Sequence, residues 1–153
     1  MSTKSQSSSA RYQALLQLLR TSESLWNASR VFFERWELSP SQFNILNLLH
    51  LNPEGCTQIE LSRLLIMHRS NITGLVDRLE KRGLLQRKDN PADRRAYKVS
   101  LTTKGRKLIE KILPDYYGAA EYVWENFPEA RTKQLVGDLQ KLNANLEKFF
   151  PEK

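Results

Sequence analysis

The sequence is poor in the residues that build disulfide frameworks and metal sites. Its 153 residues include one cysteine, Cys56, and two histidines, His50 and His68. One cysteine excludes an intrachain disulfide and a cysteine-based zinc finger, and two histidines are too few for a histidine-rich metal site. We therefore expect no metal and no cofactor, in a protein of the reducing cytoplasm.

Long apolar runs are also missing. No stretch of about 18 apolar residues is present, which argues against a transmembrane helix and predicts a protein without a membrane partner. Residues 1–10 contain five serines and no apolar segment, so we expect a flexible tail there rather than a secretory signal. The length and the 40% apolar content predict one compact domain, or a small domain with long appended elements.

No arrangement of residues is typical of an enzyme. The sequence has no recognisable set of nucleophile, base and orienting group, no glycine-rich phosphate loop and no metal-binding constellation. The segment Thr102–Gly105 has some likeness to a phosphate-binding loop, but it lacks the preceding glycines. We therefore predict that the protein is not an enzyme.

Positive charge is concentrated in the middle of the chain. The net charge is +7, and residues 62–111 alone carry 14 Lys and Arg against 5 Asp and Glu, a net charge of +9. The other 103 residues have a net charge of −2. A solubilising surface would spread the excess over the whole chain, so this clustering favours a segment that binds a polyanion.

Both ends of the chain read as long amphipathic helices. The segment Tyr12–Trp36 has no glycine or proline and repeats an aromatic or leucine side chain every seven residues. The last helix, opened by residues 126–129, carries leucines spaced four and three apart, as in a short coiled-coil seam. These stripes are too large for a small module to cover, so we assign them to a dimer interface. Its predicted residues are Tyr12, Leu19, Trp26, Leu135, Leu139, Leu142, Leu146 and Phe149.

The centre of the chain carries helix start and stop signals. Ser39–Gln42 and Thr57–Glu60 are capping boxes, each opening a short helix. A third helix is expected over Arg69–Arg82, with Gly83 as its stop. Short strands over 84–88 and 97–101 flank a polar, basic turn and predict a hairpin.

Three helices followed by a two-stranded hairpin form a winged helix-turn-helix. The predicted fold is therefore mainly α with a small β-hairpin, a winged helix-turn-helix flanked by N- and C-terminal dimerisation helices. We expect the winged domain over 38–114 and the helical dimerisation region over 11–37 and 115–153, after the 1–10 tail. A kink is expected at Pro114, inside the helix that follows the hairpin.

Four stretches carry a family resemblance: 38–43, 54–58, 71–80 and, most specifically, the wing segment 90–102. With them the chain resembles the MarR family of transcriptional regulators. The resemblance implies a homodimer that binds a pseudo-palindromic operator, usually as a repressor, and is often released by a small aromatic or anionic effector. Peroxide-sensing members carry a reactive cysteine in the first helix, whereas Tyr12–Trp36 has none, and zinc-sensing members need more ligands than two histidines supply.

Side chains for DNA recognition are expected on the third helix and the hairpin. Arginine can read guanine, asparagine adenine, and threonine a thymine methyl, although Ser70 and Asn71 could equally cap the helix. Basic residues further along are expected to contact phosphates or solvent. Asp93 is expected to order the wing turn, and the resemblance makes Arg95 the arginine that reaches the minor groove. The predicted DNA-binding residues are Arg69, Ser70, Asn71, Thr73, Arg78, Lys81, Arg82, Arg87, Lys88, Arg94, Arg95 and Lys98.

Several residues have two interpretations. Trp26, Trp36 and Tyr116 could line an effector pocket, or serve only in core and dimer packing. Cys56 is more often a small apolar filler than a redox switch. The histidines could form a pH switch but are more often surface or helix-end residues. The main alternative function is a winged-helix module that binds a protein without specific DNA readout, which would not need the basic wing.

Overall fold

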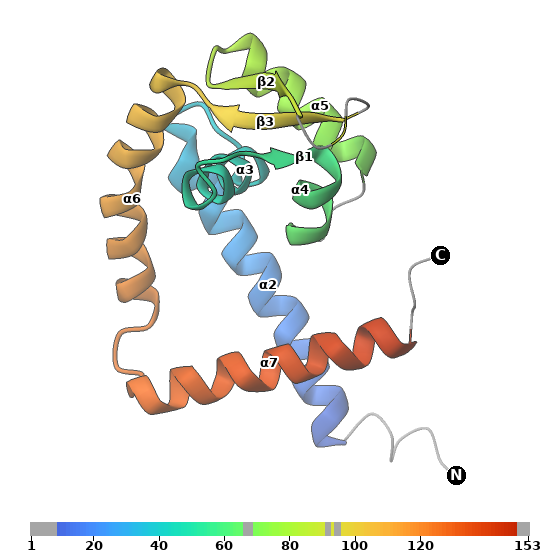
Figure 1. The fold of residues 1–153 in the computed structure, drawn as a ribbon. Helices are drawn as coiled ribbons and strands as arrows, with labels where there is room; N and C mark the ends of the chain where they lie inside the picture. Colours follow the sequence, from blue (N-terminus) through green and yellow to red (C-terminus); the bar gives the residue numbers. More distant parts are fainter. Residues whose placement is uncertain (1–8, 66–68, 91–92, 94–95, 150–153) are drawn as a thin grey trace. The chain divides into compact units, whose positions relative to one another are not determined.

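The computed structural model describes residues 9–65, 69–90, 93 and 96–149, without the side chains of Arg69 and Ser70. The chain divides into two compact units, Met1–Lys111 and Ile112–Lys153, and each is described here by itself. The predicted dimerisation region, 11–37 and 115–153, draws on both units and stays a prediction. Figure 1 shows the helices and strands along the chain.

The first helix, α2, spans Ala10–Glu34, and the Ser9 hydroxyl caps it by accepting the Tyr12 N–H at 3.2 Å. Of the expected tail over 1–10, Ser9 and Ala10 thus belong to the start of α2, and residues 1–8 lie outside the described residues. The helix was predicted to reach Trp36. It ends two residues earlier because the chain turns at Glu37, which has a positive φ of 53°.

Helix α3 spans Pro40–Leu51 and begins with the predicted capping box. The Gln42 N–H donates to the Ser39 hydroxyl, and the Ser39 N–H donates to the Gln42 side chain. Phe43, on the buried face of α3, stacks on Phe33 of α2 with ring centroids 4.2 Å apart. Burying both rings removes a large apolar area from water and fixes the end of α2 on α3.

The helix-turn-helix consists of α4, Gln58–Leu64, and α5, Arg69–Lys81. The predicted capping box of Thr57 and Glu60 is confirmed at the start of α4. Gly83 follows α5 with a φ of 70°, which confirms the predicted stop. Together with α3, these helices precede the wing, as the sequence predicted.

The sheet has three antiparallel strands in the order β1-β3-β2, so the expected two-stranded hairpin is incomplete. Strands β2, Leu85–Asp89, and β3, Tyr97–Leu101, form the hairpin. Strand β1, Cys56–Thr57, pairs with Val99 and Lys98 of β3. This strand was not predicted, because two residues are too short to show an alternating pattern.

The core of the first unit is apolar and draws on its helices and on the start of the wing. Its largest fully buried side chains include Phe33, Phe43, Ile45, Leu46, Leu49, Leu61, Ile72, Val76, Leu79, Leu84 and Ile109. Four of these come from α3 and three from α5, so both helices have one face fixed in the core. The opposite face of α5 is left for other contacts.

Helix α6, Thr103–Val123, begins in the first unit and continues into the second, where α7 spans Glu129–Phe149. Helix α6 continues past Pro114 as one element, and the kink expected at this proline stays a prediction. No residue of α7 is buried, and Phe149 is 78% exposed. In the part of the chain that is described, no helix is long and apolar enough to cross a membrane.

Candidate nucleic-acid interface

Helix α5 is the second helix of the helix-turn-helix, and its core face is the predicted one. Ile72, Leu75, Val76 and Leu79 are all buried. On another face, the Thr73 hydroxyl donates to the Gln58 side-chain oxygen at 2.9 Å, which joins α5 to the start of α4. The predicted base reader Thr73 therefore also fixes how the two helices cross. Gln58 escaped the sequence analysis because no local signal marks a partner fifteen residues away.

The outer face of α5 is polar and basic. Asn71, Arg78 and Lys81 are exposed. A Cβ at Gly74 would come within 4 Å of one atom outside the backbone of its own helix, the Arg78 Nη1 at 3.4 Å. No other described helix therefore packs against this glycine. Gly74 therefore does not serve tight packing between helices in the described structure, and it leaves the surface of α5 free of a side chain at this position.

The Arg87 guanidinium lies between two carboxylates of α5. One Nη donates to Asp77 and the other to Glu80. The hydrogen bond to Asp77 is the largest reason that the pKa of Arg87 is raised above its usual value, with the Glu80 charge adding to it. Arg87 was predicted as a phosphate contact. That contact stays a prediction, and the structure shows that Arg87 ties strand β2 to α5.

Lys88 and Lys98 face each other across the wing hairpin. They are direct cross-strand partners in the β2–β3 ladder. Like charges in this position repel each other, and an anion between or beside them would relieve the repulsion. Both were predicted as contacts to the DNA backbone, and that role stays a prediction.

The tip of the wing is described only in part. The Asp93 N–H donates to the Asn90 carbonyl at 3.2 Å, and the Ala96 N–H donates to the Asp93 carbonyl at 3.1 Å. Asp93 therefore sits inside the turn that it was predicted to order. Arg94 and Arg95 lie outside the described residues, as does His68, and so do the side chains of Arg69 and Ser70.

Arg82, just after α5, was predicted to contact phosphate or solvent, and in the structure it also has partners within the chain. Its guanidinium donates to the backbone carbonyls of Glu37 at 2.6 Å and Trp36 at 3.2 Å. These two hydrogen bonds engage both terminal nitrogens of the guanidinium within the chain. The sequence analysis missed this use because the partners are 45 and 46 positions away.

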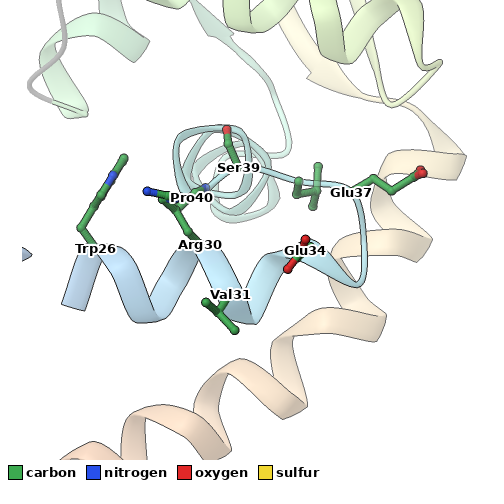
Figure 2. Close-up of a pocket in the computed structure, with 8 residues that line it drawn as sticks. Trp26, Arg30, Val31, Glu34, Glu37, Ser39 and Pro40 are labelled. Carbon is green, nitrogen blue, oxygen red and sulfur yellow. The ribbon is translucent and has the colours of Figure 1, made fainter. Parts of the chain in front are cut away.

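A groove of about 580 Å³ runs between the end of α2 and the start of α3. Figure 2 shows Trp26 and Arg30 on the side of α2 that faces α3, whereas Val31 points away. Of the predicted pocket residues, Trp26 borders this groove, whereas Trp36 lies under the Arg35 guanidinium, 3.8 Å from its ring centroid. Tyr116 is in the second unit beside Tyr117, with ring centroids 6.3 Å apart.

Cys56 and His50 are both withdrawn from solvent. Cys56 is 5% exposed, and its burial, followed by the Glu60 charge, raises the pKa of the thiol, against a smaller lowering by Lys98. A redox sensor needs the opposite shift, so the burial and the raised pKa favour the interpretation of Cys56 as an apolar filler. His50 is half-buried on α3. Within the described ranges, no group of three or more His, Cys, Asp or Glu residues could hold a metal ion.

Comparison with known proteins agrees with this geometry. Residues 36–96 match the family model described as MarR family. The chain is 31% identical over 118 residues to the HTH-type transcriptional regulator PapX of Escherichia coli, covering 76% of this chain and 72% of PapX. It is 28% identical over 138 residues to the transcriptional repressor YetL of Bacillus subtilis, covering 90% and 83% of the two chains.

Solved structures share the fold. A MarR-family regulator from Rhodococcus sp. RHA1 superposes with a TM-score of 0.78 at 25% identity, covering 88% of this chain and 95% of its own. MepR of S. aureus, solved as a complex with DNA, has a TM-score of 0.77 at 22% identity, with 88% and 97% covered. With its winged helix-turn-helix and these relatives, the chain belongs to the MarR family of transcriptional regulators.

Proposed function

We propose that this protein is a sequence-specific DNA-binding repressor that acts as a homodimer on a pseudo-palindromic operator. The observation that carries the proposal is helix α5, which has one face in the core and an exposed polar and basic face beside the wing. An α-helix of this kind fits the major groove, where the four base pairs present distinct patterns. The name of YetL as a repressor and the DNA complex of MepR support the same function.

Base readout is proposed for the start of α5. Asn71 is exposed there and offers both a donor and an acceptor, which suits adenine. Arg69 and Ser70 precede it in the same helix. Thr73 contributes by holding α4 and α5 together, in addition to any contact with a thymine methyl.

Phosphate contacts are proposed for the basic residues that are not held by carboxylates or carbonyls in the described structure. These are Arg78 and Lys81 on α5 and Lys88 and Lys98 on the hairpin. Arg94 as a phosphate contact and Arg95 in the minor groove are proposed from the sequence and the family resemblance, because both lie outside the described residues. For Arg82 and Arg87 we propose a positioning role in place of the predicted phosphate contact, because both guanidinium groups have partners within the chain. They fix α5 in place rather than touch DNA.

A second copy of the chain is proposed to cover the apolar faces of α2 and α7. Each helix leaves large side chains in solvent, and their exposure in one chain is costly. The exposed members are Tyr12, Leu19, Trp26, Leu135, Leu142, Leu146 and Phe149, with Leu139 half-exposed. Two copies would present two α5 helices to two half-sites, which is why a pseudo-palindrome is expected.

Release by a small aromatic effector is a further part of the proposal. The groove beside Trp26 has the size of a small-molecule site and offers an indole ring for stacking. Arg30 could pair with an anionic group, but Glu34 and Glu37 also border the groove. The lining therefore favours aromatic character over negative charge in the effector.

A salt titration on duplex DNA tests the proposal. A dimer that neutralises about eight phosphates gives a slope of log K against log salt near −7. Selection from random duplexes should then yield a two-fold symmetric site. A slope near zero with binding intact, or binding to a protein but to no duplex, would favour the alternative winged-helix interaction module.

A further inference from the structure

The end of α2 has a specific hydrogen-bond pattern. The Leu38 N–H donates to the Phe33 carbonyl at 3.3 Å, and the Glu37 N–H donates to the Glu34 carbonyl at 2.8 Å. With Glu37 in the left-handed region, this is a Schellman motif. The left-handed position is usually glycine, because a side chain there is strained. Glu37 therefore holds this conformation only because other contacts support it.

The end of α5 has the same motif with the expected residue. The Leu84 N–H donates to the Leu79 carbonyl at 3.0 Å, and the Gly83 N–H donates to the Glu80 carbonyl at 2.8 Å. A Cβ at Gly83 would meet nothing within 4 Å, so only its φ of 70° calls for glycine. The two helix ends thus differ in one respect: the left-handed position is a glycine at the end of α5 and a residue with a side chain at the end of α2.

Arg82 supplies support to the turn at Glu37. It lies one residue before Gly83, and its guanidinium donates to the carbonyls of Trp36 and Glu37, at the strained turn. The carboxylate of Glu37 is 3.9 Å away and its side chain is 90% exposed, so the carbonyls are the main partners. A cation at this place also neutralises the partial negative charge at the ends of both helices.

Together with the Arg82 side chain, two hydrogen bonds from the start of α6 form what we call the clamp at the end of α5. The Lys104 ammonium donates to the Arg82 carbonyl at 2.8 Å, and the Thr102 hydroxyl donates to the Gly83 carbonyl at 2.7 Å. The carbonyls at the end of α5 are therefore held from one side, while the Arg82 side chain reaches to the other. A shift of the α2 turn would pull on the last turn of α5.

We propose that Arg82 is a positioning residue that holds the end of the recognition helix α5 on the Glu37 turn, so that DNA affinity depends on the conformation of this turn. Glu37 and Leu38 also border the groove beside Trp26. An occupant of the groove would thus contact Glu37, whose carbonyl Arg82 holds. The predicted effect on DNA affinity rests on the proposed function, whereas the hydrogen bonds of Arg82 do not depend on it.

Three variants of the full chain test the clamp by hydrogen exchange and DNA binding. Arg82→Ala should speed exchange of the Glu37 and Leu38 amides about tenfold or more, because bonds from a charged donor are lost. DNA affinity should fall about three- to tenfold with the salt slope unchanged, since no phosphate contact is removed. Arg82→Lys keeps the charge but lacks the two-pronged geometry, so it should behave like Arg82→Ala.

Lys81→Ala is the matched control. It removes the neighbouring exposed charge on α5, so the salt slope should fall by about one while amide exchange at Glu37 stays as in the unaltered chain. The inference is overturned if Arg82→Ala lowers the slope by about one without faster exchange, or if Arg82→Lys restores full affinity. If the unaltered chain binds no duplex, the proposed function fails, and the exchange rates alone decide on the clamp.

Discussion

The Thr73 hydroxyl and the Gln58 side chain join the two helices of the helix-turn-helix through one hydrogen bond of 2.9 Å. Thr73→Val removes the donor and keeps the shape, so the free energy of unfolding should fall by about 1 kcal/mol. Operator affinity should fall as well, because the crossing of α4 and α5 is less fixed. Urea unfolding and DNA titration measure both effects. Thr73→Ser retains the hydroxyl and should stay close to the unaltered protein in both.

Asn71 should determine which operator sequence is preferred, whereas Lys81 should contribute affinity for any sequence. Asn71→Ala is expected to relax the base preference at one or two positions of each half-site, at a cost of about 1–3 kcal/mol for the preferred sequence. Lys81→Ala should weaken binding to all sequences about equally. Binding to a panel of single-base operator variants distinguishes the two. The same sequence-dependent loss in both variants would contradict the proposed orientation of α5 in the groove.

Glu60 should make stability depend on acid pH. Its carboxylate accepts the Thr57 N–H at 2.7 Å, and this bond is the largest reason that the pKa of Glu60 lies below its usual 4.5. A lowered pKa means that the cap is fully present above the unfolded value and is lost as the pH falls through the folded value. Urea unfolding at several pH values below about 5 measures the loss.

The control for that experiment is Glu60→Gln. Glutamine also closes a capping box but does not titrate, so the variant should lose less stability between neutral and acid pH. Parallel pH profiles for the two proteins would show that Glu60 does not titrate as the structure implies.

Gly105 is the glycine that should tolerate alanine least. A Cβ there would lie 2.1 Å from the Leu84 backbone oxygen, which cannot move aside easily. Gly105→Ala should therefore cost about 1–3 kcal/mol of unfolding free energy, or more. Gly118→Ala, also in α6, meets nothing within 4 Å in the described structure and should stabilise the helix by up to about 1 kcal/mol. Denaturation midpoints compare the two.

The seam of α7 should control assembly. Leu139→Asp with Leu142→Asp would place two carboxylates where a partner is proposed, at a cost of several kcal/mol, roughly, for each unpaired buried charge. We expect monomers or unfolded chains, a steep loss of operator affinity and no preference for a two-fold site. Sedimentation and DNA binding are measured on one sample. A dimer that binds the palindrome normally would mean that the interface lies elsewhere.

Local signals in the sequence were sufficient for much of the fold. Both capping boxes act within four residues, so Ser39 and Thr57 marked the starts of α3 and α4 correctly. Gly83 marked the end of α5 for the same reason. Glu37 gave no such signal, since its left-handed conformation depends on Arg82 rather than on its own side chain.

The residues of the candidate site were harder to assign. A basic residue on a predicted DNA-binding element looks the same in sequence whether it faces solvent, a carboxylate or a carbonyl. Arg82 and Arg87 were placed with the phosphate contacts, yet their partners come from the α2 turn and from α5. Strand β1 was missed because two residues form a strand only through their neighbour β3.

The burial of Cys56 has a practical consequence. Its raised pKa keeps the thiol protonated at neutral pH, and maleimides need an accessible thiolate. The unaltered chain should therefore resist labelling, and a cysteine introduced on the surface, such as Leu51→Cys at the end of α3, becomes the reactive one. In an assembly of two copies, one substitution would install a symmetric pair of spin labels, and their separation would report each rearrangement of the two winged modules.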